Sequence, residues 1–267
     1  MSEQKREKIS IIGCGWLGLP LAKHLIGLGY AVKGSTTSVD KLEKLRDHCI
    51  EAYCIDLSNP DSVALSQCLS SDILVVNVPP SRIDGSFDAL IKAVEEAKLE
   101  KVVYVSTTSV YPDSNNEVFE EDAQHIVSKH SGVDNLALEE QFTLNTNFKT
   151  TVVRFAGLYN TARNPGRFLA GKKNLKGKDN PINLIHLDDC VGVITALIEK
   201  DIWGETFNAC SDTHPKREAF YTLAANKLGL EPPKFSEEPA PFKTINADKL
   251  KTAAGYRYIH PDPMKTI

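Results

Sequence analysis

Three glycines near the start of the chain constrain its fold more than any other feature. Gly13, Gly15 and Gly18 follow the apolar run 9–12 and precede a stretch with the spacing of an amphipathic helix. In this context the first glycine permits a tight turn, the second lets the backbone approach a pyrophosphate, and the third lets the helix pack on the strand. N–H groups at the helix start then hold phosphates. The sequence therefore predicts a dinucleotide-binding loop; the alternative is a loop of this kind that binds nothing.

Composition excludes several classes of function. The 267 residues are 42% hydrophobic, enough for one core or for a nucleotide domain with a small cap. A formal charge of −4 gives no field that attracts nucleic acid or an anionic membrane, and no apolar run is long enough to span a bilayer. Six cysteines lack metal or redox spacing. We therefore expect a cytoplasmic protein with reduced, structural cysteines and no nucleic-acid or membrane partner.

Short apolar runs alternate with helical stretches along the first part of the chain. Strands are expected at 9–12, 30–34, 52–55, 72–78, 101–106 and 150–155, and helices at 17–28, 39–48, 87–98 and 134–145. This alternation predicts an α/β fold, a Rossmann-type doubly wound parallel sheet with right-handed crossovers. Beyond residue 156 the pattern changes to loops with helices at 188–199 and 216–228. We expect a dinucleotide domain over 1–158, to which 181–204 returns, and a small C-terminal substrate-binding cap over 159–180 and 205–267.

Further segments carry a family resemblance. They are Val-Ser-Thr-Thr-Ser-Val-Tyr at 105–111, Arg-Phe-Ala-Gly-Leu-Tyr at 154–159, Ile-His-Leu-Asp-Asp at 185–189 and Phe-Asn at 207–208. In order and spacing the chain resembles the extended and atypical short-chain dehydrogenase/reductases, the superfamily of nucleoside-diphosphate-sugar epimerases and dehydratases. The resemblance implies that the first segment carries the active-site Ser/Thr, that the second meets the nicotinamide, and that the third opens a helix. By analogy it also implies a homodimer.

The residues after the second strand bear on the choice of cofactor. In NAD-specific relatives an acidic residue there binds the ribose 2′-OH, about twenty residues past the glycines. This chain has the run 35–38, Ser-Thr-Thr-Ser, with Lys41 and Lys44 close behind. Hydroxyl and N–H groups do not repel a 2′-phosphate as a carboxylate does. The sequence therefore favours NADP, with NAD, or an ordinary loop, as the alternatives.

The predicted cofactor site has sixteen residues. The assignments after strands three, four and six, to the adenine, the ribose and the nicotinamide, rest on the resemblance alone. The full set is Gly13, Gly15, Trp16, Leu17, Gly18, Ser35, Thr36, Thr37, Ser38, Asp56, Leu57, Val78, Pro79, Pro80, Phe155 and Gly157.

The usual catalytic pair of the family is missing. Typical members use a Tyr as general acid/base with a Lys four residues later, and no tyrosine of this chain is followed by Lys at that spacing. Alignment of the helix on 139–140 puts Ser131 or Gly132 at the Tyr position and Asn135 or Leu136 at the Lys position. A free phenol has a pKa near 10, and a positioned acid/base contributes roughly 10²–10⁴ in rate. Either another residue has this role, or the protein binds its cofactor without efficient turnover.

Two residues are the catalytic candidates. Thr107 lies in the register of the family's catalytic Ser/Thr, and Tyr111, four residues later, is the best local substitute for the missing Tyr. The alternative for Tyr111 is an aromatic residue in the cleft wall. Asp84 or Asp88 is a weaker candidate for the family's active-site Asn.

His186 and the basic residues between 160 and 178 can each be explained by a structural or by a functional role. His186 is an acid/base candidate by its pKa near 6.5, but is better explained as part of a turn in which Asp188 or Asp189 caps the next helix. No histidine has metal-ligand spacing, and we expect no metal. Between 160 and 178 six basic residues occur without an acidic one. They either bind a diphosphate or form a solvated loop.

Two functions remain open. The first is an NADP-dependent oxidoreductase-type enzyme that acts on a small molecule such as a nucleotide sugar by transient hydride transfer, at a cleft between the sheet's C-terminal edge and the cap. The second is an NADP(H) sensor that presents its cap to a protein partner, which the missing Tyr/Lys pair favours.

Overall fold

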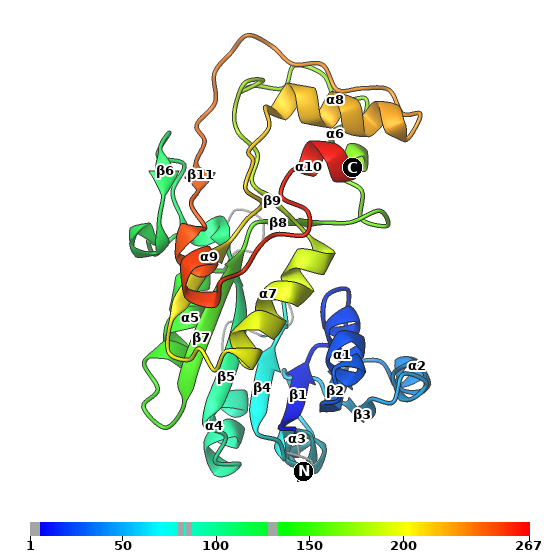
Figure 1. The fold of residues 1–267 in the computed structure, drawn as a ribbon, viewed down its shortest axis with the longest axis vertical. Coiled ribbons are helices and arrows are strands. Elements are labelled where there is room, and N and C mark those ends of the chain that lie inside the picture. Colours follow the sequence, from blue (N-terminus) through cyan, green and yellow to red (C-terminus); the bar gives the residue numbers. More distant parts are fainter. Residues whose placement is uncertain (1–5, 80–82, 84–86, 128–132) are drawn as a thin grey trace. The chain divides into compact units, whose positions relative to one another are not determined.

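A computed structural model describes residues 6–79, 83, 87–127 and 133–267 (Figure 1). Pro80, Asp84, Ser131 and Gly132, which the sequence analysis singled out, lie outside these residues. The chain divides into two compact units. Unit 1 comprises Met1–Ser106, His125–Val153 and Ile194–Thr206, and unit 2 comprises Thr107–Gln124, Arg154–Val193 and Phe207–Ile267.

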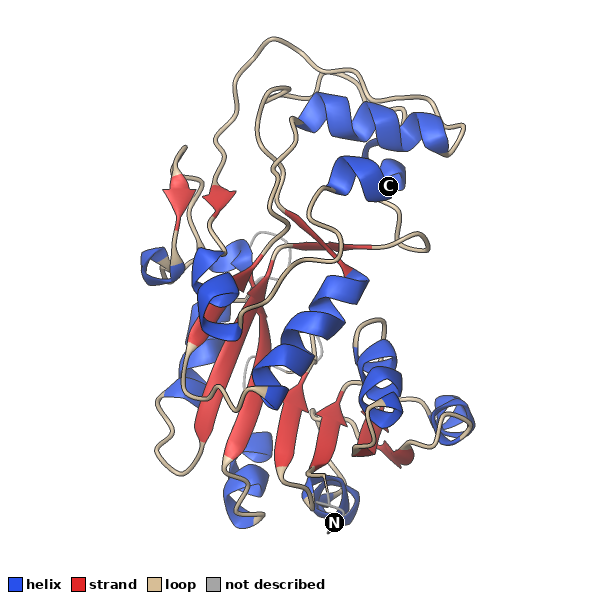
Figure 2. Ribbon diagram, viewed as in Figure 1, coloured by secondary structure: helices blue, strands red, loops and turns tan. Residues whose placement is uncertain are grey.

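The central element is a seven-stranded parallel sheet (Figure 2). Its strand order is β10-β7-β5-β4-β1-β2-β3, so the direction in which successive strands are added reverses between β1 and β4. Ligands of open α/β sheets bind beyond the carboxyl ends of the strands at such a point. The strands are β1 (Lys8–Ile12), β2 (Ala31–Thr36), β3 (Glu51–Cys54), β4 (Ile73–Val76), β5 (Lys101–Thr107), β7 (Lys149–Phe155) and β10 (Thr206–Ala209).

The core of unit 1 follows from the alternation of side chains along buried strands. Ile12, Val76 and Tyr104 point to one face of the sheet, where helices α3, α4 and α5 supply Leu65, Leu90 and other apolar residues. Aromatic rings fill part of this face: Phe142 stacks on Tyr104 with ring centroids 4.8 Å apart. Among its described residues, this unit has the helices α1 (Gly18–Gly27), η1 (Val39–Lys41), α2 (Leu42–Arg46), α3 (Ser62–Leu69), α4 (Asp88–Glu96) and α5 (Asn135–Thr143). Helix α7 (Leu187–Glu199) starts in unit 2 and ends in unit 1.

Unit 2 has a smaller core. Tyr159, Leu184 and Phe220 are buried together, and helices α6 and α8 meet where a Cβ on Gly166 would lie 2.5 Å from the carbonyl oxygen of Ala224. Only glycine permits this approach. The other elements are η3 (Thr108–Val110), β6 (Glu117–Val118), η4 (Glu120–Asp122), β8 (Gly157–Tyr159), α6 (Gly166–Leu169), β9 (Leu184–His186), α8 (Arg217–Lys227), β11 (Thr244–Ile245), α9 (Asp248–Ala254) and α10 (Pro263–Thr266).

The six expected strands and six expected helices are confirmed, with ends that differ by a few residues. The predicted helix 39–48 is two pieces, η1 and α2. Helix α3 was not predicted, although Asp61 caps it by accepting hydrogen bonds from the N–H groups of Val63 and Ala64. In unit 2 the short elements β6, β8, β9, β11, α6, α9 and α10 are likewise not among the predicted ones. All six cysteines are free thiols. Over the residues described, no helix combines the length and hydropathy needed to cross a bilayer.

Candidate functional site

The turn after β1 is built from three neighbouring strands of unit 1. Gly13 has φ +100°, and a Cβ there would lie 2.3 Å from the carbonyl oxygen of Asn77. Asn77 follows β4, and its side-chain Nδ2 donates to the carbonyl oxygen of Gly13 over 3.1 Å. From the other side, the Gly13 N–H donates to Oγ of Ser35 in β2 over 3.0 Å. The backbone of the turn is therefore fixed at the point where the strand order reverses.

The other two glycines have different roles. A Cβ on Gly18 would lie 2.2 Å from the carbonyl oxygen of Gly13, so glycine is required where α1 starts against the turn. A Cβ on Gly15 would meet nothing within 4 Å, and this residue is exposed. The open space beside Gly15 is where a ligand can approach the backbone closely.

The start of α1 suits an anion. The helix has no acidic residue in its first turn, and Leu17 at the N-cap makes no side-chain capping bond. A helix N-terminus carries partial positive charge from its backbone N–H groups. The fixed turn, the space beside Gly15 and this helix end together fit the pyrophosphate of a dinucleotide.

The predicted ribose-binding residues divide into supporting and accessible ones. Ser35 is 2% exposed, and besides Oγ its carbonyl oxygen accepts from the Cys14 N–H over 2.8 Å, so it supports the glycine turn. Oγ1 of Thr36 accepts from the Ser38 N–H over 3.3 Å. Thr37 is exposed. Thr37 is therefore the side chain of this run that is most accessible to a ligand.

The remaining cofactor candidates of unit 1 follow the ends of strands. Asp56 comes after β3, and its Oδ1 accepts from the N–H and the hydroxyl of Ser58, which shapes a tight turn. Val78 and Pro79 follow β4, half-buried and exposed respectively. Trp16 is half-buried, and Leu17 is 3% exposed.

Two cofactor candidates lie at the end of β7 and the start of β8. Phe155 is buried. The Gly157 N–H donates to the carbonyl oxygen of Asn183 over 3.1 Å, and a Cβ there would come within 2.9 Å of the Leu184 side chain. Gly157 thus allows β8 to pair with β9.

The two catalytic candidates belong to unit 2 and differ in access. Thr107 ends β5, is half-buried, and its Oγ1 accepts from the Ser109 N–H over 3.3 Å. Tyr111 is 2% exposed; its hydroxyl donates to Oδ1 of Asn208 over 2.6 Å and accepts from Nη1 of Arg154 over 2.7 Å. Burial raises the pKa of Tyr111 to about 12, although Arg154 opposes the shift. The phenol is therefore neutral at pH 7, and its hydroxyl is already used as donor to Asn208 and as acceptor from Arg154.

Tyr111→Phe distinguishes a structural role of Tyr111 in the cleft wall from a catalytic role. If Tyr111 is a wall residue, the variant should lose about 1–3 kcal/mol of unfolding free energy, because a buried acceptor on Asn208 and a donor on Arg154 lose a partner. Urea denaturation followed by circular dichroism measures this. Unchanged stability would contradict the structural role and return Tyr111 to the catalytic candidates.

Sequence reasoning missed the buried polar residues around Tyr111. Arg154 is 4% exposed, and its Nη1 also donates to the carbonyl oxygen of Glu120 over 2.7 Å. The Asn208 N–H donates to Oε1 of Glu120 over 2.8 Å. In unit 1, Oγ of buried Ser106 donates to Oε1 of buried Glu139 over 2.5 Å. One sequence feature indicates these contacts: Arg154 is a charged residue inside an apolar strand, where a buried charge needs polar partners.

The turn at His186 corrects one expectation. Asp189 is fully buried, and its carboxylate accepts from the Tyr256 hydroxyl and from the N–H groups of Ile259 and His260. It therefore holds a distant segment of the chain rather than capping α7. The Asp188 N–H in the first turn instead donates to Nδ1 of His186 over 3.2 Å. Burial, with His260 nearby, lowers the pKa of His186.

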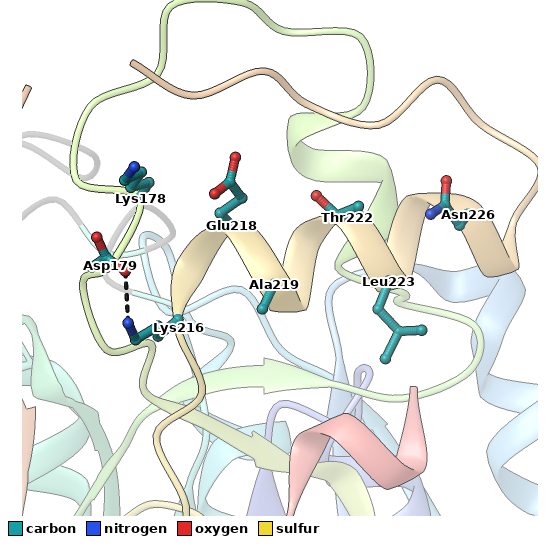
Figure 3. Close-up of a pocket in the computed structure, with 8 residues that line it drawn as sticks. All are labelled: Lys178, Asp179, Lys216, Glu218, Ala219, Thr222, Leu223 and Asn226. Atoms are coloured by element: carbon teal, nitrogen blue, oxygen red, sulfur yellow. Dashed lines mark hydrogen bonds and ion pairs between the residues drawn. The ribbon is translucent and has the colours of Figure 1, made fainter. Parts of the chain in front are cut away.

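The basic residues between 160 and 178 are partly neutralised. Lys176 pairs with Glu238 and Lys178 with Glu237, both at 2.5 Å. Lys178 also lines a surface pocket along α8, where Lys216 pairs with Asp179 at 2.8 Å (Figure 3). Paired cations have less charge to offer a diphosphate. Arg163, Arg167, Lys172 and Lys173 are the other basic residues of this segment.

Comparison with known proteins agrees with this geometry. The sequence model of a family described as NAD(P)H-binding matches residues 13–200. Protein YeeZ of Escherichia coli (strain K12) is 34% identical over 270 residues, which cover 97% of this chain and 98% of that protein.

Two solved structures share the fold over nearly the whole chain. A putative NAD-dependent epimerase/dehydratase from Methylobacillus flagellatus is 24% identical, with a TM-score of 0.74, over 97% of this chain and 96% of that one. UDP-glucuronic acid 4-epimerase from Bacillus cereus, in complex with UDP-glucuronic acid and NAD, is 20% identical, with a TM-score of 0.75, over the same shares. The resemblance seen in the sequence is confirmed. The chain belongs to the NAD(P)H-binding family, and its fold is that of the NAD-dependent epimerases and dehydratases.

Proposed function

We propose that this protein is an NADP(H)-dependent, epimerase-like oxidoreductase that acts on a nucleotide sugar. The observation that carries the proposal is the turn at Gly13–Gly18, fixed by Asn77 and Ser35 and open beside Gly15. Fold alone does not identify a substrate. The nucleotide-sugar class is suggested by the UDP-glucuronic acid bound in the Bacillus cereus enzyme of the same fold.

The preference for NADP rests on the segment after β2. The run 35–38 contains no carboxylate, and the exposed side chains of Lys41 and Lys44 follow it closely. A 2′-phosphate there meets hydroxyl groups, backbone N–H groups and nearby positive charge, which favour a dianion.

Thr37→Asp should reverse this preference. We expect the ratio of NADPH to NADH affinity to fall by about 10–100-fold, because a carboxylate repels the 2′-phosphate and can accept a hydrogen bond from a 2′-hydroxyl. Isothermal titration with both cofactors measures the ratio. Ser62→Asp, an exposed position in the first turn of α3, adds the same charge elsewhere in unit 1 and should leave the ratio unchanged. An unchanged ratio in Thr37→Asp would exclude this segment from the ribose site.

The nicotinamide cofactor, when bound, supplies a hydride acceptor and donor. Thr107, by its register in the family motif, is the proposed hydroxyl that touches substrate or nicotinamide. Tyr111 is the other catalytic candidate from the sequence. Its hydroxyl is buried and hydrogen-bonded to both Asn208 and Arg154, which supports a structural role as an aromatic residue of the cleft wall instead. Because no Tyr-x-x-x-Lys pair is present, we expect turnover that is slow for this class of enzyme.

A panel of nucleotide sugars incubated with NADP and the protein tests the enzymatic proposal. Nuclear magnetic resonance should detect an epimerised or oxidised sugar, and Thr107→Ala should slow its formation. No product from any member of a broad panel would count against an enzyme.

The second candidate function is a sensor of NADP(H) that acts through a protein partner. The absent Tyr/Lys pair is the observation that favours it. It predicts tight cofactor binding without product. The division into a dinucleotide domain and a substrate-binding cap, the homodimer and the cytoplasmic location stay predictions.

A further inference from the structure

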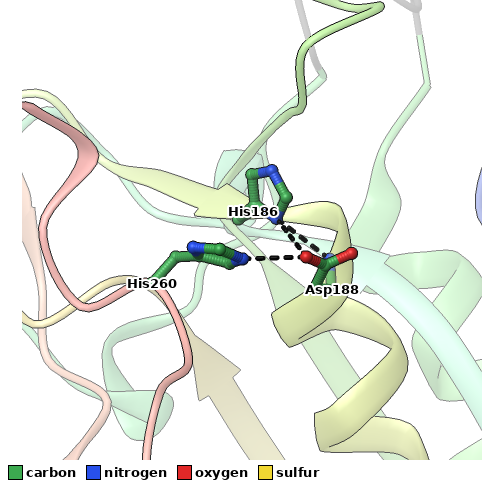
Figure 4. Close-up of side chains that lie close together, drawn as sticks. All are labelled: His186, Asp188 and His260. Carbon is green, nitrogen blue, oxygen red and sulfur yellow. Dashed lines mark hydrogen bonds and ion pairs between the residues drawn. The ribbon is translucent and has the colours of Figure 1, made fainter. Parts of the chain in front are cut away.

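Two histidines far apart in the sequence meet one carboxylate at the start of α7. His186 ends β9, Asp188 lies in the first turn of α7, and His260 belongs to the segment before α10 (Figure 4). Nε2 of His260 lies 2.8 Å from Oδ2 of Asp188, and Nδ1 of His186 lies 3.3 Å from the same oxygen. One possible ligand atom from each residue falls within 4.8 Å of the other two. All three residues belong to unit 2.

The contacts around Asp188 place two acceptors against each other. A backbone N–H can only donate, so the bond from the Asp188 N–H to Nδ1 of His186 identifies Nδ1 as the unprotonated nitrogen. The Nδ1 atom lies 3.3 Å from Oδ2 of Asp188. Because an imidazole nitrogen has a single lone pair, a cation bound at Nδ1 would replace the bond from the Asp188 N–H. Two acceptors at this distance repel unless a proton or a cation lies between them.

The residues around the cluster hold both rings in place. The rings of Tyr159 and His186 pack in a T-shaped pair with centroids 5.2 Å apart, and the two imidazole centroids are 4.0 Å apart. The fully buried Asp189 accepts from the backbone N–H groups of Ile259 and His260, which fixes the backbone that carries the second ring. Supporting contacts of this kind orient the ligands of metal sites.

Exposure gives the cluster an access route. The side chain of Asp188 is 57% exposed, whereas those of His186 and His260 are 12% and 22% exposed. An ion can therefore enter on the carboxylate side while the imidazoles remain shielded. At ordinary metal–ligand distances of about 2.0–2.2 Å, neighbouring ligand atoms in a tetrahedral site lie roughly 3.3–3.6 Å apart. The 3.3 Å between Nδ1 of His186 and Oδ2 of Asp188 matches this spacing, and the 2.8 Å between Nε2 of His260 and the same oxygen would have to widen on binding.

We propose that His186, Asp188 and His260 form a binding site for a divalent transition-metal ion of the zinc class. Two imidazoles and one carboxylate are a donor set that suits zinc and its neighbours rather than calcium or magnesium. Three protein ligands leave a fourth position open to water or to a small ligand. The bound ion would tie the start of α7 to the 256–262 segment.

Zinc binding to the full-length protein, freed of metal by chelation and dialysis, tests the proposal. Titration calorimetry with zinc chloride should show one ion per chain, and the thermal midpoint should rise with zinc and fall back with EDTA. Asp188→Asn and His260→Ala should each weaken binding by more than the roughly 10–100-fold typical of an outer-shell substitution. His24→Ala, at an exposed histidine of α1, should change neither measurement.

Cobalt distinguishes this site from binding at a cysteine. Co²⁺ held by nitrogen and oxygen ligands should give a visible ligand-field band without an intense near-ultraviolet thiolate band, and Asp188→Asn should remove it. No zinc binding, a thiolate band that Cys49→Ser removes, or equal binding by wild type, Asp188→Asn and His260→Ala would overturn the proposal. None of these readouts depends on enzymatic activity.

Discussion

Gly15→Asp should abolish dinucleotide binding and leave the protein folded. A side chain at this position enters space that is open in the structure, so the fold has no reason to resist it. The new carboxylate would occupy the approach of the pyrophosphate and repel it. We expect affinity for NADPH to fall at least 100-fold, about 2.7 kcal/mol. The same charge at the start of α1 is favourable for the helix, so the thermal midpoint should stay constant or rise.

Matched substitutions separate charge, bulk and position. Gly15→Ala adds bulk without charge and should weaken binding less than Gly15→Asp. Gly27→Ala, at the far end of the same helix, also places a Cβ in open space. It should leave cofactor binding unchanged and stabilise the helix by up to about 1 kcal/mol. Normal binding of NADPH by the Gly15→Asp variant would show that the turn is not a phosphate site.

Asp189→Ala should destabilise the protein strongly. The buried carboxylate accepts from two backbone N–H groups and from the Tyr256 hydroxyl, at distances of 2.6–2.9 Å. Removing it leaves three part-buried donors without their acceptor, each worth up to about 1–3 kcal/mol. Because water can enter and the segment can relax, we expect a total of roughly 3–5 kcal/mol in urea unfolding.

The adjacent residue is the control for this loss. Asp188→Ala removes a carboxylate that is 57% exposed, and in the absence of metal we expect a change below about 1 kcal/mol. Similar losses for Asp188→Ala and Asp189→Ala would contradict the assignment of Asp189 as the group that holds the 256–260 segment.

The sequence was sufficient to predict the sheet and the glycine turn because both depend on local patterns. Buried parallel strands are short apolar runs, and the turn needs glycine at fixed offsets. Helix α3 has a capping residue in Asp61 but only eight residues, too few for a clear period. Strand β11 could not be predicted from its two residues, because it exists through pairing with β6, more than 120 positions earlier.

The polar contacts of unit 2 could not be predicted from the sequence either, because they join residues that are far apart in the chain. The sequence predicts that Asp188 or Asp189 caps the helix that follows, since acidic residues at helix starts commonly do, and Asp189 has a different role. Its partners lie 67–71 positions later in the chain, and no local pattern identifies them. His186 and His260 likewise show no metal spacing, because the fold and not the local sequence brings them together.

Titration of the protein with NADPH and NADH tests the central claim most directly. Trp16 lies in the glycine turn, and Trp203→Phe leaves it as the only tryptophan, so fluorescence reports on the site itself. We predict saturable quenching by both cofactors, with tighter binding of NADPH. Absence of binding by either cofactor to the folded protein would contradict the account.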